Sequence, residues 1–179
     1  IHDISPLLLP RIAVCPGDVP YARRVALAMA EGDHLDLSSL HTTVHVGAHA
    51  DAPSHYAADG EGIDRVALEP YLGPCQVVRV SVARGARILP ADVTVPLTAP
   101  RVLFHTGTCP DPDRFNEDFA SLSPELVHWL HGQGCVLVGL DTPSVDPFAS
   151  KALESHQALR TTGLRNLEGL VLEAVPPGD

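Results

Sequence analysis

The sequence predicts a single mixed α/β domain. A chain of 179 residues has the length of one domain and can bury a sizeable core. Residues 135–140 form an apolar run of strand length, typical of a fully buried strand. Ser123 and Pro124 combine an N-cap residue with a first-turn proline, and apolar positions at helical spacing follow them. No internal repeat, low-complexity segment or interdomain linker interrupts this pattern.

The first half of the chain predicts short strands and turns. Residues 1–5 and 11–15 are typical of strands, and residues 16–18, Pro-Gly-Asp, of a turn. Residues 25–29 fit either a short helix or a strand. Residues 40–46 are rich in Thr and Val and predict another strand. A polar loop is expected over 56–62, and a short helix over 63–68 that ends before Pro70.

The second half alternates strands with helices. Strands are expected over 76–82, 101–105 and 135–140, with a loop over 83–90. Helices are expected over 123–132 and 150–162, and Gly163 is the expected end of the second helix. Glu168 is predicted to stand at the start of a last strand, over 169–175.

Composition restricts the classes of function. Twelve Lys and Arg against 22 Asp and Glu give a formal charge of -10, which argues against nucleic acid or an anionic membrane surface as partner. No apolar run reaches membrane-spanning length. The four cysteines lack C-x-x-C spacing, so neither a disulfide framework nor a cysteine zinc site is indicated. We therefore expect a small-molecule substrate and, by default, a cytoplasmic protein.

Residues 45–55 hold three histidines and an aspartate, separated mostly by Gly, Ala, Pro and Ser. Any one histidine on a strand is usually packed or solvated, but four donors separated by small residues favour a metal site. Gly47 and Pro53 disfavour a continuous helix. In an extended segment His49 and Asp51 share one face, and a bend at Gly47 lets His45 join them.

Two later residues are candidates for the same site. His156 falls on the apolar face of the predicted 150–162 helix, where an inward imidazole is either a hydrogen-bonded core residue or a metal ligand. Glu168 lies between Leu167 and Leu170 and is either an exposed strand-end charge or a buried ligand. The residues alone leave both choices open.

The pattern H-x-G-A-H-x-D-x-P-x-H over 45–55 resembles the signature of the cyclase-type metal-dependent hydrolases, whose best-known members are the bacterial kynurenine formamidases (arylformamidases). Further segments that match this family occur in order along nearly the whole chain: 3–6 (DISP), 16–18 (PGD), 105–108 (HTGT), 115–119 (FNEDF), 140–146 (LDTPSVD) and 167–170 (LEGL). The resemblance implies a mostly β core flanked by a few helices.

The resemblance also implies the roles of the site residues. His45, His49 and Asp51 would hold one metal ion, and Asp51, His156 and Glu168 a second, with zinc expected at both and Mn²⁺ as an alternative. His55 would act as general acid and base, or else as a hydrogen-bond partner behind the ligands. Cys15 occupies a substrate-binding position where the family commonly has Trp. His105 matches a family position that often holds Arg, and it is expected at most to line the pocket.

By resemblance, the implied reaction is hydrolysis of N-formyl-L-kynurenine to L-kynurenine and formate, in tryptophan degradation. Because a thiol lacks the flat surface of an indole, Cys15 keeps open an isatin hydrolase-like or other cyclic or aryl amide hydrolase. A catalytically idle metal-binding fold is the alternative from another class, and the presence of His55 argues against it.

Relatives associate as homodimers or higher homo-oligomers, and this is expected here. Residues 1–179 are interpreted as one domain that lacks the one or two C-terminal strands typical of relatives.

Overall fold

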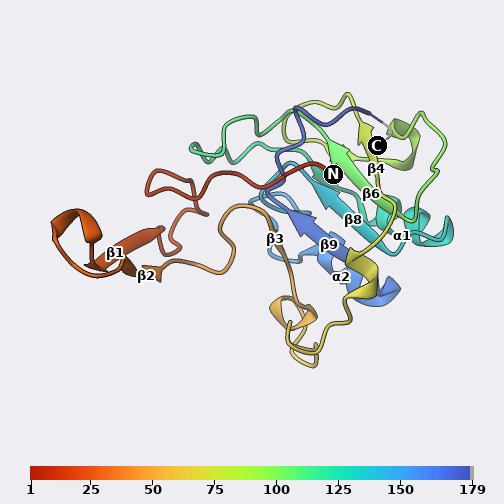
Figure 1. Ribbon diagram of the computed structural model, residues 1–179. Helices are drawn as coiled ribbons and strands as arrows, with labels where there is room; N and C mark the ends of the chain where they lie inside the picture. Colours follow the sequence, from red (N-terminus) through yellow and green to blue (C-terminus); the bar gives the residue numbers. More distant parts are fainter. Residues whose placement is uncertain (178–179) are drawn as a thin grey trace.

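A five-stranded mixed sheet forms the centre of the computed structural model, which describes residues 1–177 (Figure 1). The strand order is β3-β9-β8-β6-β4; β9, β8, β6 and β4 are mutually parallel, and β3 pairs antiparallel with β9 at one edge. The strands are β3 His49–Ala50, β4 Gln76–Arg79, β6 Arg101–His105, β8 Leu137–Leu140 and β9 Arg165–Glu168. The predicted fold class, a mostly β core with a few helices, is confirmed.

Alternate residues of the parallel strands face opposite sides of the sheet, as the two-residue period of a strand requires. One side packs against both helices, and the other packs against the C-terminal segment and Ile4 near the N-terminus. The helix side includes Val78, Val102, Phe104, Val138 and Leu140. The opposite side includes Val77, Leu103, Leu137, Leu170 and Leu172. The parallel strands are therefore covered on both faces, which explains their nearly continuous apolar character.

The two α-helices lie next to each other on one face of the sheet. Helix α1, Pro124–Gly132, has the predicted start, because the Ser123 hydroxyl accepts a 3.0 Å hydrogen bond from the backbone N–H of Leu126. Helix α2, Glu154–Thr162, begins four residues later than predicted, since Leu153 adopts a left-handed φ of 50°. It ends at Gly163, as predicted, where φ is 76°.

The remaining elements are short. Strands β1, Ala22–Leu27, and β2, Leu37–His41, form an antiparallel hairpin that projects from the body (Figure 1). Strands β5 and β7 form a two-residue parallel pair. Their bounds, and those of the 3-10 turns, are β5 Arg87–Ile88, β7 Ser121–Leu122, η1 Met29–Glu31, η2 Pro53–His55, η3 Glu69–Tyr71 and η4 Pro90–Asp92.

Several sequence predictions are wrong in detail. Residues 1–5 and 11–15 form no strand, and residues 63–68, predicted as a short helix, form only a turn and bends. The strand predicted over 40–46 ends at His41, and the chain then bends through 44–48. Residues 169–175, predicted as the last strand, form no strand. The last strand is instead β9, Arg165–Glu168, and it ends there because Gly169 has a φ of 67°. The undecided segment 25–29 is mostly strand.

No helix within residues 1–177 combines the length and apolar character needed to cross a membrane. Gly178 and Asp179, the end of the predicted domain, lie outside the described residues.

Candidate metal centre

A cavity of about 330 Å³ opens at the carboxyl ends of the parallel strands. Its lining includes His105 at the end of β6, Asp141 just after β8, and Gly169 just after β9. Open parallel sheets commonly bind ligands at this edge, because loops from neighbouring strands meet there. His45 and His49 belong to the same wall, and the pocket-lining position expected for His105 is confirmed.

Two glycines let the histidine loop, residues 45–55, approach the end of β9. Gly47 has a φ of 63°, and a Cβ at this position would meet Leu8 Cδ2 at 2.8 Å. A Cβ on Gly169 would collide with the carbonyl oxygen of Gly47. That same carbonyl accepts a 2.9 Å hydrogen bond from His49 Nδ1, which leaves His49 Nε2 as the nitrogen available to a ligand. The backbone at Gly47 therefore fixes both the position of His49 and the orientation of its ring.

Strand pairing brings the predicted ligands of the histidine loop onto Glu168. His49 on β3 lies directly opposite Glu168 on β9. His49 Nε2 is 3.6 Å from both Asp51 Oδ1 and Glu168 Oε2. His45 Nδ1 lies 3.1 Å from His49 Nε2 and 3.2 Å from Asp51 Oδ1. Four of the five predicted ligand residues thus converge on one point.

His156, the fifth, enters from the first turn of α2. Its Nε2 is 3.4 Å from Asp51 Oδ2 and 3.7 Å from Glu168 Oε1. Its Nδ1 donates a 2.9 Å hydrogen bond to Asp146 Oδ2, because a carboxylate can only accept. Asp146 therefore turns Nε2 of His156 toward the two carboxylates. The two oxygens of Asp51 face different histidines, His45 and His156.

Sequence reasoning assigned no role to two residues that hold this cluster. Asp146 appeared only within the family segment 140–146, without a function. Asn166 donates 2.7 Å and 3.3 Å hydrogen bonds to Asp51 Oδ2 and Glu168 Oε1. Asn166 precedes Glu168 by two residues on β9, so strand alternation could have placed both side chains on one face. Nothing local to the sequence connects Asp146 with His156.

Burial and mutual proximity control the protonation of the cluster. Burial, followed by the charge of Asp51, raises the pKa of Glu168 to about 8. Burial lowers the pKa of His156, but its hydrogen bond to Asp146 and the nearby carboxylate of Asp51 outweigh burial and raise that pKa to about 9. Burial also opposes the ionisation of Asp51, yet the neighbouring imidazoles, first of all His156, hold its pKa below the usual value. The cluster therefore retains protons that a bound cation would displace.

These residues fit a divalent metal. Asp51 Oδ1 and His156 Nε2 are buried without a hydrogen-bond partner among the described residues, which is costly unless something else binds them. The ligand atoms of His49, Asp51 and Glu168 all lie within 4.8 Å of one another. The same holds for His45, Asp51 and His55. Imidazole nitrogens and carboxylate oxygens are a donor set suited to zinc and similar ions.

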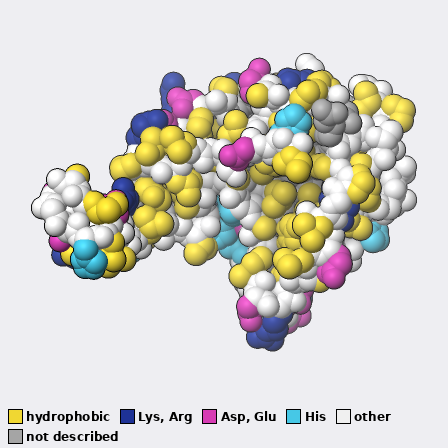
Figure 2. All heavy atoms as spheres, viewed as in Figure 1, with side chains coloured by type: hydrophobic (Ala, Val, Ile, Leu, Met, Phe, Trp, Pro, Cys, Tyr) yellow, Lys and Arg dark blue, Asp and Glu magenta, His cyan; other side chains and the backbone are white. Residues whose placement is uncertain are grey.

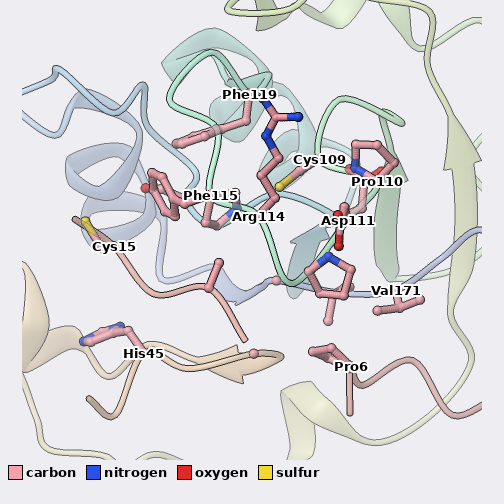
Figure 3. Close-up of a pocket in the computed structure, with 18 of the residues that line it drawn as sticks. Pro6, Cys15, His45, Cys109, Pro110, Asp111, Arg114, Phe115, Phe119 and Val171 are labelled. Atoms are coloured by element: carbon pink, nitrogen blue, oxygen red, sulfur yellow. The ribbon is translucent and has the colours of Figure 1, made fainter. Parts of the chain in front are cut away.

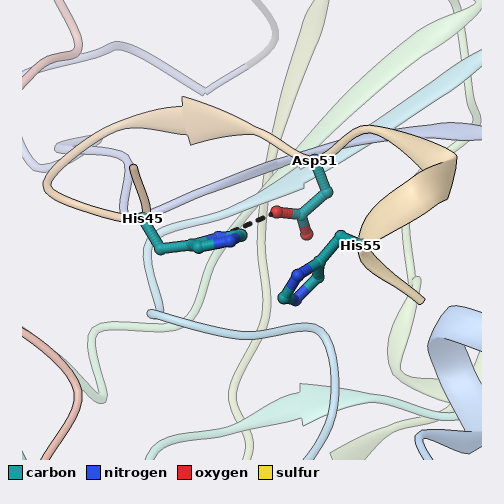
Figure 4. Close-up of side chains that lie close together, drawn as sticks. All are labelled: His45, Asp51 and His55. Carbon is teal, nitrogen blue, oxygen red and sulfur yellow. Dashed lines mark ion pairs between the residues drawn. The ribbon is translucent and has the colours of Figure 1, made fainter. Parts of the chain in front are cut away.

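His55 points into the same space from η2 (Figure 4). Its ring centroid is 4.2 Å from that of His45 and 5.9 Å from that of His156. The side chain is more exposed than the predicted ligands. Burial is the main cause that lowers the pKa of His55, so that the ring is neutral near pH 7. A neutral imidazole can accept a proton, and at this position it can also reach a metal; its predicted role remains a prediction.

Phenylalanines that the sequence analysis did not single out form the aromatic wall of the cavity. Phe115 packs edge-on against Phe119, with ring centroids 6.2 Å apart, and lies 5.6 Å from Phe148. All three line the cavity, as does Cys15. In the view of Figure 3 His45 lies below Phe115 and Phe119, and Cys15 lies at the left between His45 and Phe115. The family segment 115–119 contained the signal for two of these rings, but no periodicity assigned them to the pocket.

The chain is similar to known proteins along its whole length. Residues 3–147 match the family described as "Putative cyclase". Kynurenine formamidases of Bordetella pertussis and Bordetella bronchiseptica are each 40% identical over 184 residues, which cover 100% of this chain and 86% of the relative.

Solved structures share the fold. A potential metal-dependent hydrolase with cyclase activity superposes with a TM-score of 0.81 at 23% identity, covering 99% of this chain and 84% of the other. Isatin hydrolase A from Ralstonia solanacearum gives a TM-score of 0.79 at 20% identity, with 99% and 81% covered.

Proposed function

The chain belongs to the cyclase family, and on that premise we propose that it is a metal-dependent hydrolase that cleaves N-formyl-L-kynurenine to L-kynurenine and formate. The relatives at 40% identity are kynurenine formamidases, and a formamidase cleaves an amide C–N bond. The chain is thus a hydrolase acting on an amide bond, and the formyl substrate is the finer assignment.

One observation carries the proposal. Five buried or half-buried donors converge, and two of them, His45 and His49, line a cavity that is also lined by aromatic rings. A site of this kind can hold an aryl group and present an attached amide to a metal.

Two zinc ions are the proposed cofactors, with Mn²⁺ as the alternative. His45, His49 and Asp51 would hold one ion, and Asp51, His156 and Glu168 the other. Support comes from Asp51, because its two oxygens face His45 and His156 separately. When bound, the metal supplies Lewis acidity and a water of lowered pKa.

His55 is the proposed general acid and base. Hydrolysis adds the oxygen of water to the formyl carbon, breaks the C–N bond and leaves a proton on the aryl amine. His55 can take the proton of water and return it to the nitrogen, because its lowered pKa keeps it neutral before the reaction. Its position beside His45 and Asp51 supports this role.

Phe115, Phe119 and Phe148 are the proposed contacts of the substrate's aryl ring. Aromatic rings pack well edge-on or offset at the separations seen within this cluster. They provide the flat surface that Cys15 lacks. Cys15 remains a proposed substrate contact, because it lines the same cavity.

An isatin hydrolase-like reaction is the second candidate, and Cys15 is the observation that favours it. Both reactions would use the same metal centre and differ in whether the amide is linear or part of a ring. An idle metal-binding fold is less consistent with His55, because a storage site needs ligands but no additional base beside them.

The test is hydrolysis by chelator-treated protein, with and without added Zn²⁺ or Mn²⁺. Metal-restored release of kynurenine and formate from N-formyl-L-kynurenine is the expected result. Restored activity on isatin alone would retain the metal chemistry and reject the formamidase assignment. Metal binding without activity on either compound would reject both.

We further expect a homodimer or a higher homo-oligomer, and a cytoplasmic location. The four cysteines are unpaired, which suits a reducing compartment.

A further inference from the structure

Among the described residues, Arg114 is the only Lys or Arg that lines the cavity. It directly precedes Phe115 in the chain, and in the view of Figure 3 both residues lie above His45. The other charged or imidazole side chains of the lining are Asp111, Asp141, Glu173, His45, His49 and His105. The described wall of the cavity thus contains one side chain with a permanent positive charge.

The guanidinium of Arg114 has no hydrogen bond or ion pair within the described chain, although acidic residues lie close to it in the sequence. Asp113 instead forms an ion pair with Arg11. Asp118 accepts two hydrogen bonds from Arg84, at 2.6 Å and 2.7 Å. The donors of Arg114 are therefore available to an anion in the cavity.

The backbone turn that carries Arg114 is held by hydrogen bonds. The N–H of Arg114 donates a 3.1 Å bond to the carbonyl of Asp111, and the N–H of Asp113 donates a 3.0 Å bond to Asp111 Oδ1. The N–H of Ala13, another residue of the lining, donates a 2.9 Å bond to the carbonyl of Pro112. A backbone that is already ordered loses less conformational entropy when a ligand binds to it.

We propose that Arg114 binds a carboxylate of the substrate, so that the preferred substrates are aryl formamides that carry an acidic group. This inference rests on the proposed function and deepens it. In N-formyl-L-kynurenine a short aliphatic chain joins the aryl ring to the α-carboxylate. The proposed ring contacts include Phe115, the residue next to Arg114, so a ring packed there directs this carboxylate toward the guanidinium. Arginine suits the task because its planar fork can donate two parallel hydrogen bonds to a carboxylate.

The charge of the protein explains why this single cation is important. The chain has a formal charge of -10, and three carboxylates, those of Asp111, Asp141 and Glu173, line the same cavity. On the face shown in Figure 2, Lys and Arg side chains lie mainly near the outline of the molecule. Like charges repel a substrate carboxylate unless a cation pairs with it. Arg114 is therefore expected to select acidic aryl formamides over those without a carboxylate.

The first test measures binding without catalysis. Calorimetry on zinc-loaded protein compares L-kynurenine with kynurenamine, which is the same molecule without the carboxylate. The wild type should bind L-kynurenine about tenfold more tightly, because hydrogen bonds between charged groups are stronger than neutral ones. Arg114→Met should remove this preference, and Arg114→Lys should keep part of it, since lysine retains the charge but loses the fork. Arg114 is exposed and unpaired within the described chain, so neither variant should unfold.

Arg65→Met is the matched control. It changes the net charge by the same amount, but the Arg65 side chain is 77% exposed and lies outside the cavity lining. This variant should keep the full preference for L-kynurenine. Equal binding of the two compounds by the wild type would overturn the proposal. A preference that survives in Arg114→Met would also overturn it, because the carboxylate would then bind elsewhere, such as at the metal.

Steady-state kinetics distinguishes this inference from the proposed function. Arg114→Met should raise KM for N-formyl-L-kynurenine about tenfold and leave KM for N-formylkynurenamine almost unchanged. Equal KM values of the wild type for both compounds would retain the formamidase reaction and overturn the carboxylate site. No hydrolysis of either compound, together with binding of L-kynurenine that depends on Arg114, would reject the reaction and support the carboxylate site.

Discussion

Replacing Asp146 by Asn should weaken metal binding although Asp146 is not itself a predicted ligand. Asp146 is 1% exposed, and its Oδ2 accepts hydrogen bonds from His156 Nδ1 at 2.9 Å and from the His156 backbone N–H at 3.0 Å. Arg87 Nη1 donates to the other oxygen at 3.2 Å. Asparagine keeps the size of the side chain but removes the charge, and its NH₂ group can donate where the carboxylate accepted. The ring of His156 then loses its fixed orientation.

The size of the effect follows from this geometry. Loss of a hydrogen-bond partner behind a metal-ligating histidine typically costs about 10- to 100-fold in metal affinity. This range corresponds to roughly 1.4 to 2.8 kcal/mol. We expect the zinc dissociation constant of Asp146→Asn to rise within it, as measured by competition with a chromophoric chelator.

The same carboxylate should contribute to folding stability in a pH-dependent way. Burial opposes its ionisation, but the hydrogen bonds with His156 and Ser155 outweigh burial and lower its pKa from 3.8 to about 2. A folded-state pKa below the unfolded value stabilises the fold by about 2 kcal/mol at neutral pH. This contribution is complete above pH 3.8 and is lost as the pH falls through about 2. The difference in unfolding free energy between wild type and Asp146→Asn should therefore be largest near neutrality and shrink in acid.

Glu154→Gln is the matched control for this prediction. Glu154 also accepts a hydrogen bond from Arg87, at 2.8 Å, but among the described residues its side chain forms no hydrogen bond or ion pair with His156. Its zinc affinity should remain within twofold of the wild type. A correctly folded Asp146→Asn that binds zinc as tightly as the wild type would refute the reasoning.

Three further predictions concern the site. His55→Ala should abolish turnover of N-formyl-L-kynurenine with metal content unchanged, as measured by elemental analysis; loss of metal together with activity would make His55 a ligand instead. The pKa values of about 9 for His156 and about 8 for Glu168 imply that zinc displaces protons, so the apparent affinity should rise from pH 7 to pH 9. Calorimetry in buffers of different ionisation enthalpy measures this release, and a pH-independent affinity would contradict it. Phe115→Ala should raise KM for aryl formamides about tenfold through lost ring contact, whereas Cys15→Ala should change it less than threefold. The opposite ranking in steady-state kinetics would place the aryl ring against Cys15.

Local patterns predicted the elements whose ends are marked by local chemistry. Helix α1 was predicted from Ser123 and Pro124, and the structure has that N-cap hydrogen bond. Strand β6, Arg101–His105, has its predicted bounds. Strands were wrongly predicted over residues 1–5 and 11–15, which pair with no strand of the described chain, 1–177. β-propensity describes fit to a sheet surface, and a single segment carries no information about its partner.

For the candidate site, too, the sequence predicted one part and the structure was needed for the other. The histidine and aspartate pattern over 45–55 identified its donors, because metal affinity depends on residue type and close spacing. It gave no measure of which donors lie closest together. In the structure His55 lies as near to His45 and Asp51 as a ligand would, and His49 lies between Asp51 and Glu168.

The sequence by itself determined the family, the mixed α/β class, the N-cap of α1 and the chemical identity of the candidate donors, all of which depend on residue type and short-range spacing. Only the tertiary structure decided that Glu168 ends β9 opposite His49, that Asp146 orients His156, and that three phenylalanines face the cavity. The pairing of β1 with β2 was equally absent from the sequence predictions. The physical reason is that sheet register and close backbone approach, here between Gly47 and Gly169, depend on contacts between residues far apart in the chain.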